Sequence, residues 1–489
     1  MFCSVTSVAR VGVTPSPITV EAHIGSGGSR FSIVGLPDTA VREAKDRVKA
    51  AFAVSGLTFP NRSVVVNLSP ADLPKVGCAY DLPIALAVLG ASNDDFRPAA
   101  RCVALGELGL DGKLRPVVGG LGAAVVAAEA GLPCVLPLES SHQTDLVASC
   151  DVYPVSSLAE AVVATMKGPP SAQRDTQPTR SMAPLVDLAE IRGQHTARRA
   201  LELAAAGGHH LMMLGPPGAG KTMLAQALPG LLPDLSEPEV LEVSLAWAAA
   251  GLDRAQPARP PFRAPHHSAT VAAMIGGGSG VPVPGEVTLA HRGVLFLDEL
   301  GEFPAHILDS LRQPLENGKL LVSRKGASMT FPSRLQLVAA TNPCPCGYSN
   351  DSHIGCGCTP VAKQRYRRRF SGPLLDRLDL RVVVDRLGLS EMAGPPAEPT
   401  ASIRQRVDAA RTRQAVRAVR NADLDRKRLD AMPWSDGAQR LLARSHGSIL
   451  TARGWDRVRR VAVTIADVSD CDVIDGDHVV EAIDLRADL

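Results

Sequence analysis

The strongest signal in this chain is the stretch Gly215-Pro216-Pro217-Gly218-Ala219-Gly220-Lys221-Thr222. It follows the apolar run Leu211–Leu214, which has the composition of a buried strand, and it precedes a helix-like segment that starts at Met223. A G-x-x-x-x-G-K-T loop in this position turns backbone N–H groups around phosphate oxygens, and the helix presents its positive N-terminus to the same anion. We therefore predict a nucleotide site in which Lys221 reaches the β- and γ-phosphates and the hydroxyl of Thr222 holds Mg²⁺.

Two acidic residues follow a second apolar run downstream of this loop. The run Val294–Leu297 leads directly into Asp298 and Glu299. Asp298 is predicted to bind the Mg²⁺ and Glu299 to activate the attacking water. A third apolar run, Leu335–Thr341, ends in Asn342, whose amide can orient the water or the γ-phosphate. These features predict an ATPase that depends on Mg²⁺.

Around these motifs the chain divides into regions of different pattern. Residues 185–390 alternate short apolar runs with helical segments, which is typical of a parallel sheet covered by helices on both faces. Residues 1–167 mix alternating and helical patterns and predict an α+β domain, and the polar, Pro-containing residues 168–184 predict a linker. Residues 391–489 show Arg-rich helical patterns, the first over 402–428, and no strand signal. The expected fold class is a multidomain α/β protein.

Composition excludes several classes of protein. The 489 residues are 45% hydrophobic and 21% charged, as in ordinary globular chains. The net charge is only +2, so binding to nucleic acid must depend on local basic patches. No apolar run reaches the roughly 18 residues that cross a bilayer, and the N-terminus lacks a signal-peptide pattern. We expect a cytoplasmic protein with no membrane partner and with reduced cysteines.

The nucleotide motifs resemble those of AAA+ ATPases, and their details are similar to the magnesium-chelatase-like branch that contains the ComM/YifB family. Further matching stretches are Pro261–Ser268, Gly276–Gly278, Pro284–Glu286, Leu311–Glu316 and Leu374–Asp379. The resemblance covers nearly the whole chain. It implies an AAA+ core, a C-terminal helical lid and an N-terminal domain similar to that of Lon proteases.

The resemblance also implies roles for three further residues. Asn342 matches the sensor-1 residue, Arg377 the arginine finger that enters the neighbouring subunit's site, and Arg453 the sensor-2 residue on the lid. Both arginines would place a fixed cation beside the charge that builds up on the transferred phosphoryl group. A finger that acts on a neighbour implies a homohexameric ring. The alternatives are an ion pair of Arg377 with Asp376 or Asp379, and a solvated position for Arg453.

Two N-terminal stretches, Pro74–Ala79 and Arg115–Leu121, resemble those that carry the Ser/Lys dyad of the Lon protease domain. Position by position, Ala79 replaces the Ser and Ala124 the Lys. The dyad needs a hydroxyl nucleophile and a desolvated amine, so we expect no protease activity. A substitute nucleophile at Cys78 is the alternative, although a lone cysteine is more often a buried apolar residue.

Four cysteines form two C-x-C pairs, Cys344/Cys346 and Cys356/Cys358. Four thiolates on two short loops can close around one tetrahedral Zn²⁺. Free thiols are the alternative, because C-x-x-C is the commoner spacing, and His353 is a possible substitute ligand. A metal here would stiffen the chain directly after the third predicted strand.

Two basic segments are candidate DNA contacts. A β-hairpin is predicted from Gly318–Gly326 and Met329–Leu337, with Arg324 and Lys325 near its tip. In related hexameric helicases a hairpin in this place lines the central pore. The second segment interleaves cations with aromatic residues such as Tyr366, which can follow a phosphate backbone and stack a base. It holds five cations in seven positions, of which Lys363, Arg365, Arg367 and Arg368 are the candidate contacts. A solvated turn and an inter-subunit face are the respective alternatives.

The leading functional hypothesis is a hexameric ATP-driven motor that acts on single-stranded or branched DNA, as a helicase or in branch migration. A chelatase-type motor subunit for metal insertion and a protein-remodelling ATPase are the alternatives. Aromatic residues make up only 3% of the chain, so backbone electrostatics would dominate DNA binding, which should weaken steeply with salt.

Overall fold

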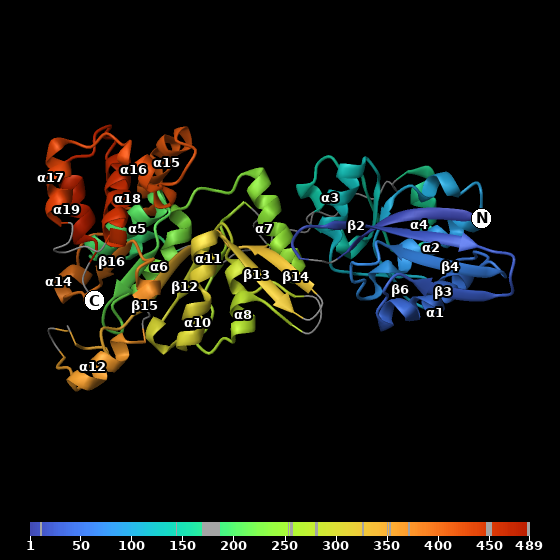
Figure 1. Cartoon of the computed structure of the whole chain (residues 1–489), viewed down its shortest axis with the longest axis horizontal. Helices are drawn as coiled ribbons and strands as arrows, with labels where there is room; N and C mark the ends of the chain where they lie inside the picture. The colour runs from blue at the N-terminus through green and yellow to red at the C-terminus, as the bar shows by residue number, and fades with distance from the viewer. Residues whose placement is uncertain are drawn as a thin grey trace.

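A computed structural model of the chain describes residues 1–486 apart from positions 10–11, 143, 169–185, 253, 255–257, 279–281, 325–326, 350, 352–353, 370–371 and 446–451 (Figure 1). Lys325, His353 and nearly all of the predicted linker lie outside the described residues. Among the described helices, each is too short or too polar to cross a bilayer.

The central region is built on a five-stranded parallel sheet, as the alternating apolar and helical runs predict. In spatial order its strands are β11 (Phe262–Arg263), β12 (Val294–Leu297), β15 (Gln336–Thr341), β10 (Leu211–Leu214) and β16 (Leu380–Val383). All five strands run the same way, so the residues that follow β10, β12 and β15 gather at one edge of the sheet. The two runs 211–214 and 294–297 form strands at the predicted positions.

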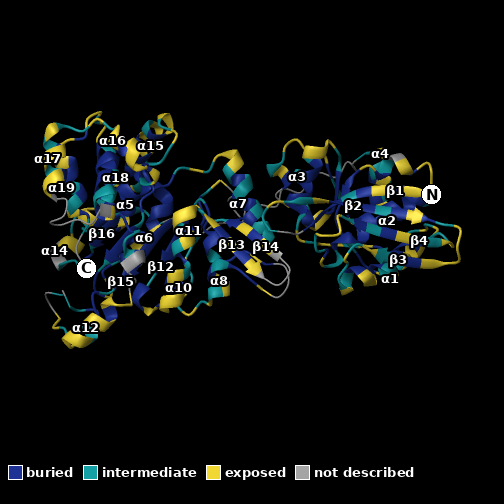
Figure 2. Cartoon of the chain, viewed as in Figure 1, coloured by how far each residue is buried: buried dark blue, intermediate teal, exposed yellow. Residues whose placement is uncertain are grey.

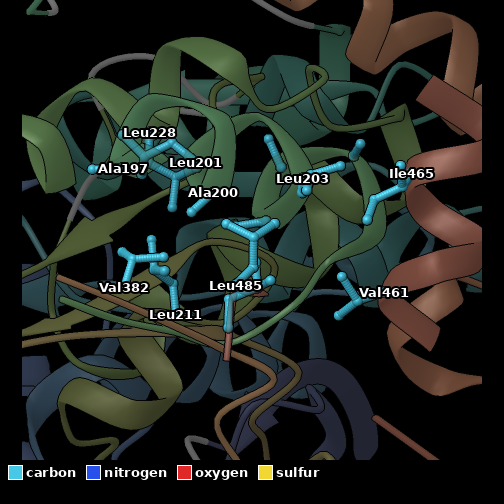
Figure 3. Packing of buried hydrophobic residues seen from close by; sticks show 14 of the residues in the cluster. Ala197, Ala200, Leu201, Leu203, Leu211, Leu228, Val382, Val461, Ile465 and Leu485 are labelled. Atoms are coloured by element: carbon cyan, nitrogen blue, oxygen red, sulfur yellow. The ribbon is translucent and has the colours of Figure 1, made fainter. Parts of the chain in front are cut away.

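Helices surround this sheet, and those at the C-terminus share its hydrophobic core (Figure 3). The helices of the central region are α5 (His195–Gly207), α6 (Lys221–Leu231), α7 (Glu237–Ala249), α8 (Val271–Ile275), α9 (Glu286–Leu289), α10 (Ala305–Ser310), α11 (Arg312–Asn317), α12 (Pro360–Arg367), α13 (Gly372–Leu375) and α14 (Leu389–Met392). The C-terminal helices are α15 (Thr400–Val416), α16 (Arg426–Asp430), α17 (Asp436–Ser445), α18 (Ala452–Val468) and α19 (Gly476–Asp484). Leu211 of the sheet, Leu201 of α5 and Val461 of α18 belong to one buried cluster, which we call the shared core cluster.

The helical pattern predicted over 402–428 is interrupted. Helix α15 ends at Val416, and Ala418 adopts a left-handed conformation with φ 53°. A short 3₁₀ turn at Asn421–Asp423 then precedes α16. Because an L-residue with positive φ cannot continue an α-helix, the chain turns there.

The N-terminal region contains a separate seven-stranded mixed sheet with helices packed on it (Figure 2). In spatial order the strands are β3 (Arg30–Val34), β4 (Ser63–Ser69), β2 (Ser16–Ile24), β1 (Phe2–Ala9), β5 (Val103–Ala104), β8 (Cys134–Pro137) and β9 (Val152–Val155). The helices are α1 (Thr39–Val54), α2 (Asp81–Ser92), α3 (Gly120–Ala130) and α4 (Leu158–Lys167), and β6 (Glu107–Leu108) pairs with β7 (Leu114–Arg115). The inward residues of β1, β2 and β4 alternate with outward ones, as a half-buried sheet requires.

The predicted hairpin is present, but its second strand is shorter than predicted. Strand β13 (Lys319–Arg324) pairs antiparallel with β14 (Ala327–Pro332), and β15 starts only at Gln336. Pro332 lacks a backbone N–H, which favours ending the strand there. Phe331 is fully buried against the sheet, and Val13 from the N-terminal region packs against the same cluster.

Candidate nucleotide site

The phosphate loop follows β10 at the carboxyl edge of the parallel sheet. A Cβ on Gly215 would lie 2.0 Å from the carbonyl oxygen of Val384, so only glycine fits this position. Gly218 and Gly220 adopt φ values of 78° and 89°, which favour glycine. Gly220 is also the N-cap of α6, so the loop leads directly into a helix N-terminus. The segment therefore has the strand, loop and helix that an anion-binding loop needs.

Lys221 is folded onto this loop and is 8% exposed. Its Nζ donates to the carbonyl oxygens of Gly215 at 2.7 Å and Pro216 at 2.8 Å, and to Oδ1 of Asn342 at 3.3 Å. Burial lowers the pKa of Lys221, while the charges of the two acidic residues after β12 oppose that shift. The structure thus brings the predicted lysine and the predicted sensor residue together.

Oxygen ligands suited to Mg²⁺ lie beside the lysine. The hydroxyl of Thr222 donates to Oδ2 of Asp298 at 2.8 Å, and the backbone N–H of Glu299 donates to Oδ1 at 2.9 Å. Hydroxyl and carboxylate oxygens are ligands that Mg²⁺ accepts while keeping several waters. The donor set fits a magnesium–nucleotide complex.

Glu299 points its carboxylate toward a histidine that the sequence did not connect with the site. Its side chain is 58% exposed, and its Oε2 lies 3.6 Å from Nδ1 of His267. Glu299 also has a positive φ of 50°, which is uncommon for a residue with a side chain and occurs often at active sites. His267 belongs to the stretch Pro261–Ser268, and only its place after β11 could have indicated this contact.

The two predicted arginines lie together, but not with Lys221. Arg377 and Arg453 line a cavity of 940 Å³ that also includes His210, Leu335 and Asp379. These last three residues directly precede β10, β15 and β16, so the cavity lies at the amino edge of the sheet. The phosphate loop is at the opposite edge.

Arg377 forms an ion pair with Glu316 at the end of α11 rather than with the two aspartates considered from sequence. Burial lowers its pKa, and the nearby charges of Arg453, Arg457 and Arg312 lower it further. Arg453 is 69% exposed, with Nη1 4.0 Å from the carboxylate of Asp376. The cavity therefore concentrates positive charge where an anion would be stabilised.

The four cysteines form a compact cluster beside the phosphate loop. The Sγ of Cys344 lies 3.4 Å from that of Cys346 and 3.7 Å from that of Cys356, and all four sulfurs lie within 4.8 Å of one another. Four thiolates around one Zn²⁺ at 2.3 Å would be about 3.8 Å apart. Hydrogen bonds from the backbone of Tyr348 and from neighbouring thiols lower the pKa of Cys346 to about 6.

The cysteine loop contacts the nucleotide site directly. At Gly347 a Cβ would lie 2.5 Å from Cδ of Pro217 in the phosphate loop. Arg386 joins the two loops, since it donates to the carbonyl oxygen of Pro217 at 3.3 Å and pairs with Asp351 at 3.2 Å. Sequence reasoning missed these contacts because the partners lie far apart in the chain.

The basic segment forms helix α12, and it differs from prediction in one respect. Arg365, Arg367 and Arg368 are exposed, and Lys363 is partly exposed. Tyr366 is 4% exposed and its hydroxyl is 3.3 Å from that of Thr341, so this ring packs inward and is not available to stack on a base. Arg324 ends β13, and its side chain, like all of Lys325, lies outside what the structure describes.

The N-terminal positions matched to a protease dyad lie in one apolar cluster. Ala79 and Ala124 are both buried there with aliphatic neighbours. Burial raises the pKa of the adjacent Cys78 thiol, so the thiolate is disfavoured. Lys75 is 1% exposed and donates to the carbonyl oxygen of Pro70.

Three family models match consecutive segments of the chain. They are described as magnesium chelatase subunit ChlI (residues 187–392), subunit ChlI of Mg-chelatase (20–140) and magnesium chelatase subunit ChlI C-terminal (397–486).

Individual relatives match over very different lengths. The YifB protein of Escherichia coli is 42% identical over 496 residues, which cover 98% of this chain and 96% of the relative. The competence protein ComM of Haemophilus influenzae is 39% identical over 495 residues, again covering 98% and 96%. The magnesium-chelatase 38 kDa subunit of Rhodobacter capsulatus is 30% identical over 188 residues, which cover 34% of this chain and 54% of the relative.

Proposed function

Because this chain belongs to the magnesium-chelatase-like AAA+ family that includes ComM and YifB, we propose that it is an ATP-hydrolysing motor that works as a homohexameric ring on DNA. The family implies ATP and Mg²⁺ as ligands. An ATP-driven ring of this kind would act in the cytoplasm on single-stranded or branched DNA.

The ring proposal depends on where the two groups of predicted site residues lie. Lys221, Asp298 and Glu299 lie at the carboxyl edge of the sheet, whereas Arg377 and Arg453 line the cavity at its amino edge. A subunit therefore carries two complementary halves of an ATPase site on opposite edges. Repeating copies head to tail would bring the two halves together, and such heterologous contacts form a ring when the rotation between copies closes.

The proposed hydrolysis follows from these residues. The loop N–H groups and Lys221 hold the phosphates, while Thr222 and Asp298 hold Mg²⁺, which neutralises phosphate charge. Glu299 accepts a proton as the water oxygen bonds to the γ-phosphorus, and the bond to the ADP oxygen breaks. Asn342 orients the water, and the neighbour's Arg377 and Arg453 stabilise the charge on the transferred group.

The decisive test is turnover by mixed rings. We expect Arg377→Ala to abolish hydrolysis while leaving ATP binding intact, and Glu299→Gln to do the same. Mixing the two variants should restore turnover, because a Glu299→Gln subunit supplies intact arginines to an Arg377→Ala neighbour. Wild-type protein that stays monomeric with ATP and polynucleotide, and does not hydrolyse ATP, would refute the proposal.

DNA as the substrate is supported by exposed positive charge. Arg365, Arg367 and Arg368 are exposed on α12, and β13 and β14 form a two-stranded sheet separate from the central one (Figure 1). We propose that these two elements, including Lys325, contact the phosphate backbone. Charge reversal at Lys325 should reduce DNA-stimulated hydrolysis and leave basal hydrolysis unchanged. The affinity for forked and for single-stranded DNA should be measured at several salt concentrations. The slope of log affinity against log salt concentration gives the number of phosphate contacts.

A chelatase-type motor subunit is the second candidate, because the matching family models carry that description. The N-terminal segment has such a match too, so its presence does not exclude this function. However, the chelatase subunit matches only 34% of the chain, whereas ComM and YifB match 98%. Hydrolysis stimulated by protein alone, and not by DNA, would instead favour a protein-remodelling ATPase.

We also propose that the cysteine cluster holds one structural Zn²⁺. The sulfur separations of 3.4–3.7 Å are close to those of a tetrahedral site. Purified protein should contain about one zinc per chain by mass spectrometry. Cys346→Ser should lose it, and Cys471→Ser, at a cysteine outside the cluster, should not. Zinc content near zero in the wild-type protein would contradict this proposal.

We propose that the N-terminal region has a Lon-like fold without protease activity. We also propose that the C-terminal helices form the AAA+ lid. Ala79 and Ala124 cannot act as nucleophile and base. The region would then serve as a docking or ring-stabilising surface. Casein digestion by the wild-type protein that disappears on Cys78→Ala would overturn this assignment.

A further inference from the structure

A buried ion pair joins the segment that carries Arg377 to helix α18. Nη1 of Arg457 donates to the backbone carbonyl oxygen of Arg377 at 2.9 Å and also to the carboxylate of Asp379. Asp379 is 3% exposed, and the Arg457 side chain is 14% exposed. One guanidinium nitrogen thus contacts both ends of a three-residue segment.

The carboxylate in this pair is firmly held in its charged form. Burial alone would raise the pKa of Asp379, but the hydrogen bond from His209 and the charge of Arg457 hold it well below its ordinary value. Nδ1 of His209 lies 3.2 Å from Oδ2 of Asp379, and its Nε2 lies 2.7 Å from the hydroxyl of Thr464, two turns further along α18. The helix is therefore attached to the sheet edge at two points.

Helix α18 also carries Arg453. Residues four apart lie on the same face of a helix, so Arg453 and Arg457 project from the same side. Both line the cavity at the amino edge together with Arg377. Fixing Arg457 against the segment 377–379 therefore fixes the position of Arg453 relative to Arg377.

The same segment is held from its other side by the C-terminal end of the described chain. Nη1 of Arg486 donates to the carbonyl oxygens of Leu378 at 2.9 Å and Asp379 at 3.1 Å. The carbonyl oxygens of residues 377, 378 and 379 thus all accept from guanidinium groups. This leaves the backbone before β16 little freedom, and the Arg377 side chain projects from a fixed base.

We propose that Arg457, held by Asp379, is a positioning residue that sets Arg377 and Arg453 at a fixed separation on the face that completes the neighbouring subunit's nucleotide site. This inference rests on the proposed ring ATPase. Arg457 would not touch the nucleotide itself. Its substitution should lower turnover in the neighbour's site and leave nucleotide binding in its own site unchanged.

The first test compares Arg457→Gln with Arg460→Gln. Arg460 lies on the same helix and lines the same cavity, but its Nε donates to the carbonyl oxygen of Leu424, away from the segment 377–379. Misplacing catalytic groups by about 1 Å can cost roughly 100-fold in rate, so we expect kcat to fall by about that factor in Arg457→Gln. The dissociation constant for a fluorescent ATP analogue should stay within about twofold of wild type, since the binding residues are untouched. Arg460→Gln should lower turnover far less than Arg457→Gln does, since it leaves the contacts of the segment 377–379 intact.

The second test places the defect in one subunit or its neighbour. Arg457→Gln, with its expected low turnover, is mixed with Glu299→Gln, which should have none. In randomly mixed rings, about a quarter of the sites pair an intact Glu299 with an intact arginine face, so about a quarter of wild-type turnover should return. No recovery would mean that Arg457 acts within its own subunit, and the inference would be wrong.

Failure of folding and failure of the proposed function give different results. If Arg457→Gln does not assemble by sedimentation, Arg457→Lys keeps a cation beside Asp379 and should retain assembly with partial turnover. An Arg457→Lys protein with full turnover and intact assembly would contradict the need for the guanidinium at this position. Absence of turnover in the wild-type protein would instead refute the ATPase proposal.

Discussion

Gly347 shows how one missing side chain joins two functional loops. With φ 87°, this residue lets the cysteine loop lie directly on Pro217 of the phosphate loop. The cysteine cluster therefore supports the residues that would hold the nucleotide. The glycine is unremarkable in sequence, where it follows Cys346, because nothing in the local pattern identifies Pro217 as its neighbour.

Gly347→Ala should weaken ATP binding. The new Cβ would lie 2.5 Å from Pro217 Cδ, and the left-handed backbone adds a cost of about 1–2 kcal/mol, so roughly a tenfold loss of affinity is expected if the loop shifts. Calorimetric titration with an ATP analogue measures it. Gly357→Ala is the matched control in the same loop, since its Cβ would meet nothing within 4 Å. Equal affinities for both variants would contradict the contact.

His210 makes stability depend on pH. Burial lowers its pKa to about 4, and its Nδ1 accepts from the backbone N–H of Leu337 at 3.0 Å, so the folded protein keeps this ring neutral. The unfolded chain, with a histidine pKa near 6.5, binds the proton first, so stability is present above that value and is lost as pH falls toward 4. Between pH 7 and pH 5 the loss should be about 2 kcal/mol. Urea unfolding at both pH values should show this difference, and His210→Asn should reduce it.

Helix α18 contributes a buried hydroxyl that contacts two other parts of the fold. The hydroxyl of Thr464 lies 2.7 Å from Nε2 of His209 before β10 and accepts from Nδ2 of Asn421 at 3.1 Å. Asn421 also donates to Asp467 at 2.7 Å. A buried polar network therefore links the helix to the sheet edge and to the turn after α15.

Thr464→Val should destabilise the protein by about 1–3 kcal/mol, because it leaves buried polar groups on His209 and Asn421 without their oxygen partner. Urea denaturation followed by circular dichroism gives the value. Thr412→Val is the control, since Thr412 is exposed on α15 and should change stability by less than about 0.5 kcal/mol. A loss no larger than the control's would show that the network contributes little.

The strand cores could be predicted from sequence, whereas element ends and helix faces could not. Short apolar runs such as Leu211–Leu214 leave no alternative to a buried strand once a phosphate loop follows. The end of β14 at Pro332 depends on where the next strand enters the sheet, and the end of α15 depends on Ala418 adopting a positive φ. Tyr366 faces inward because α12 packs on the turn after β12, a contact between distant parts of the chain.

Site residues could be identified from the sequence where they directly follow a predicted strand. Lys221, Asp298 and Asn342 follow strands at recognisable positions, and the structure places them at one edge. Arg457 could not be identified, because it lies in an arginine-rich helical region where solvated and buried cations look alike. Only its contacts with Asp379 and the Arg377 carbonyl distinguish it.

For the molecule as a whole, the central sheet and the C-terminal helices share one hydrophobic core, so we expect them to unfold together. All three tryptophans of the chain lie in this part, and Trp434 and Trp455 pack against the shared core cluster. The N-terminal region has a hydrophobic core of its own and no tryptophan.

Tryptophan fluorescence should therefore report a single transition for the central and C-terminal parts. The midpoint temperature of this transition should be higher when an ATP analogue and Mg²⁺ are present, since a ligand that binds only the folded state stabilises it. Circular dichroism, which also detects the N-terminal sheet, should show the additional unfolding of that region. Separate fluorescence transitions for Trp247 and for the two C-terminal tryptophans would contradict a common unit.

The shared core cluster limits how the central sheet and the C-terminal helices can move relative to each other. Leu211, Leu201 and Val461 belong to one buried cluster that continues from the sheet into the C-terminal helices, so separating these parts would expose the core to water. We therefore expect the central sheet and the C-terminal helices to move together. In the proposed ring, motion during a catalytic cycle would then occur as rotation of whole subunits at the contacts between adjacent copies.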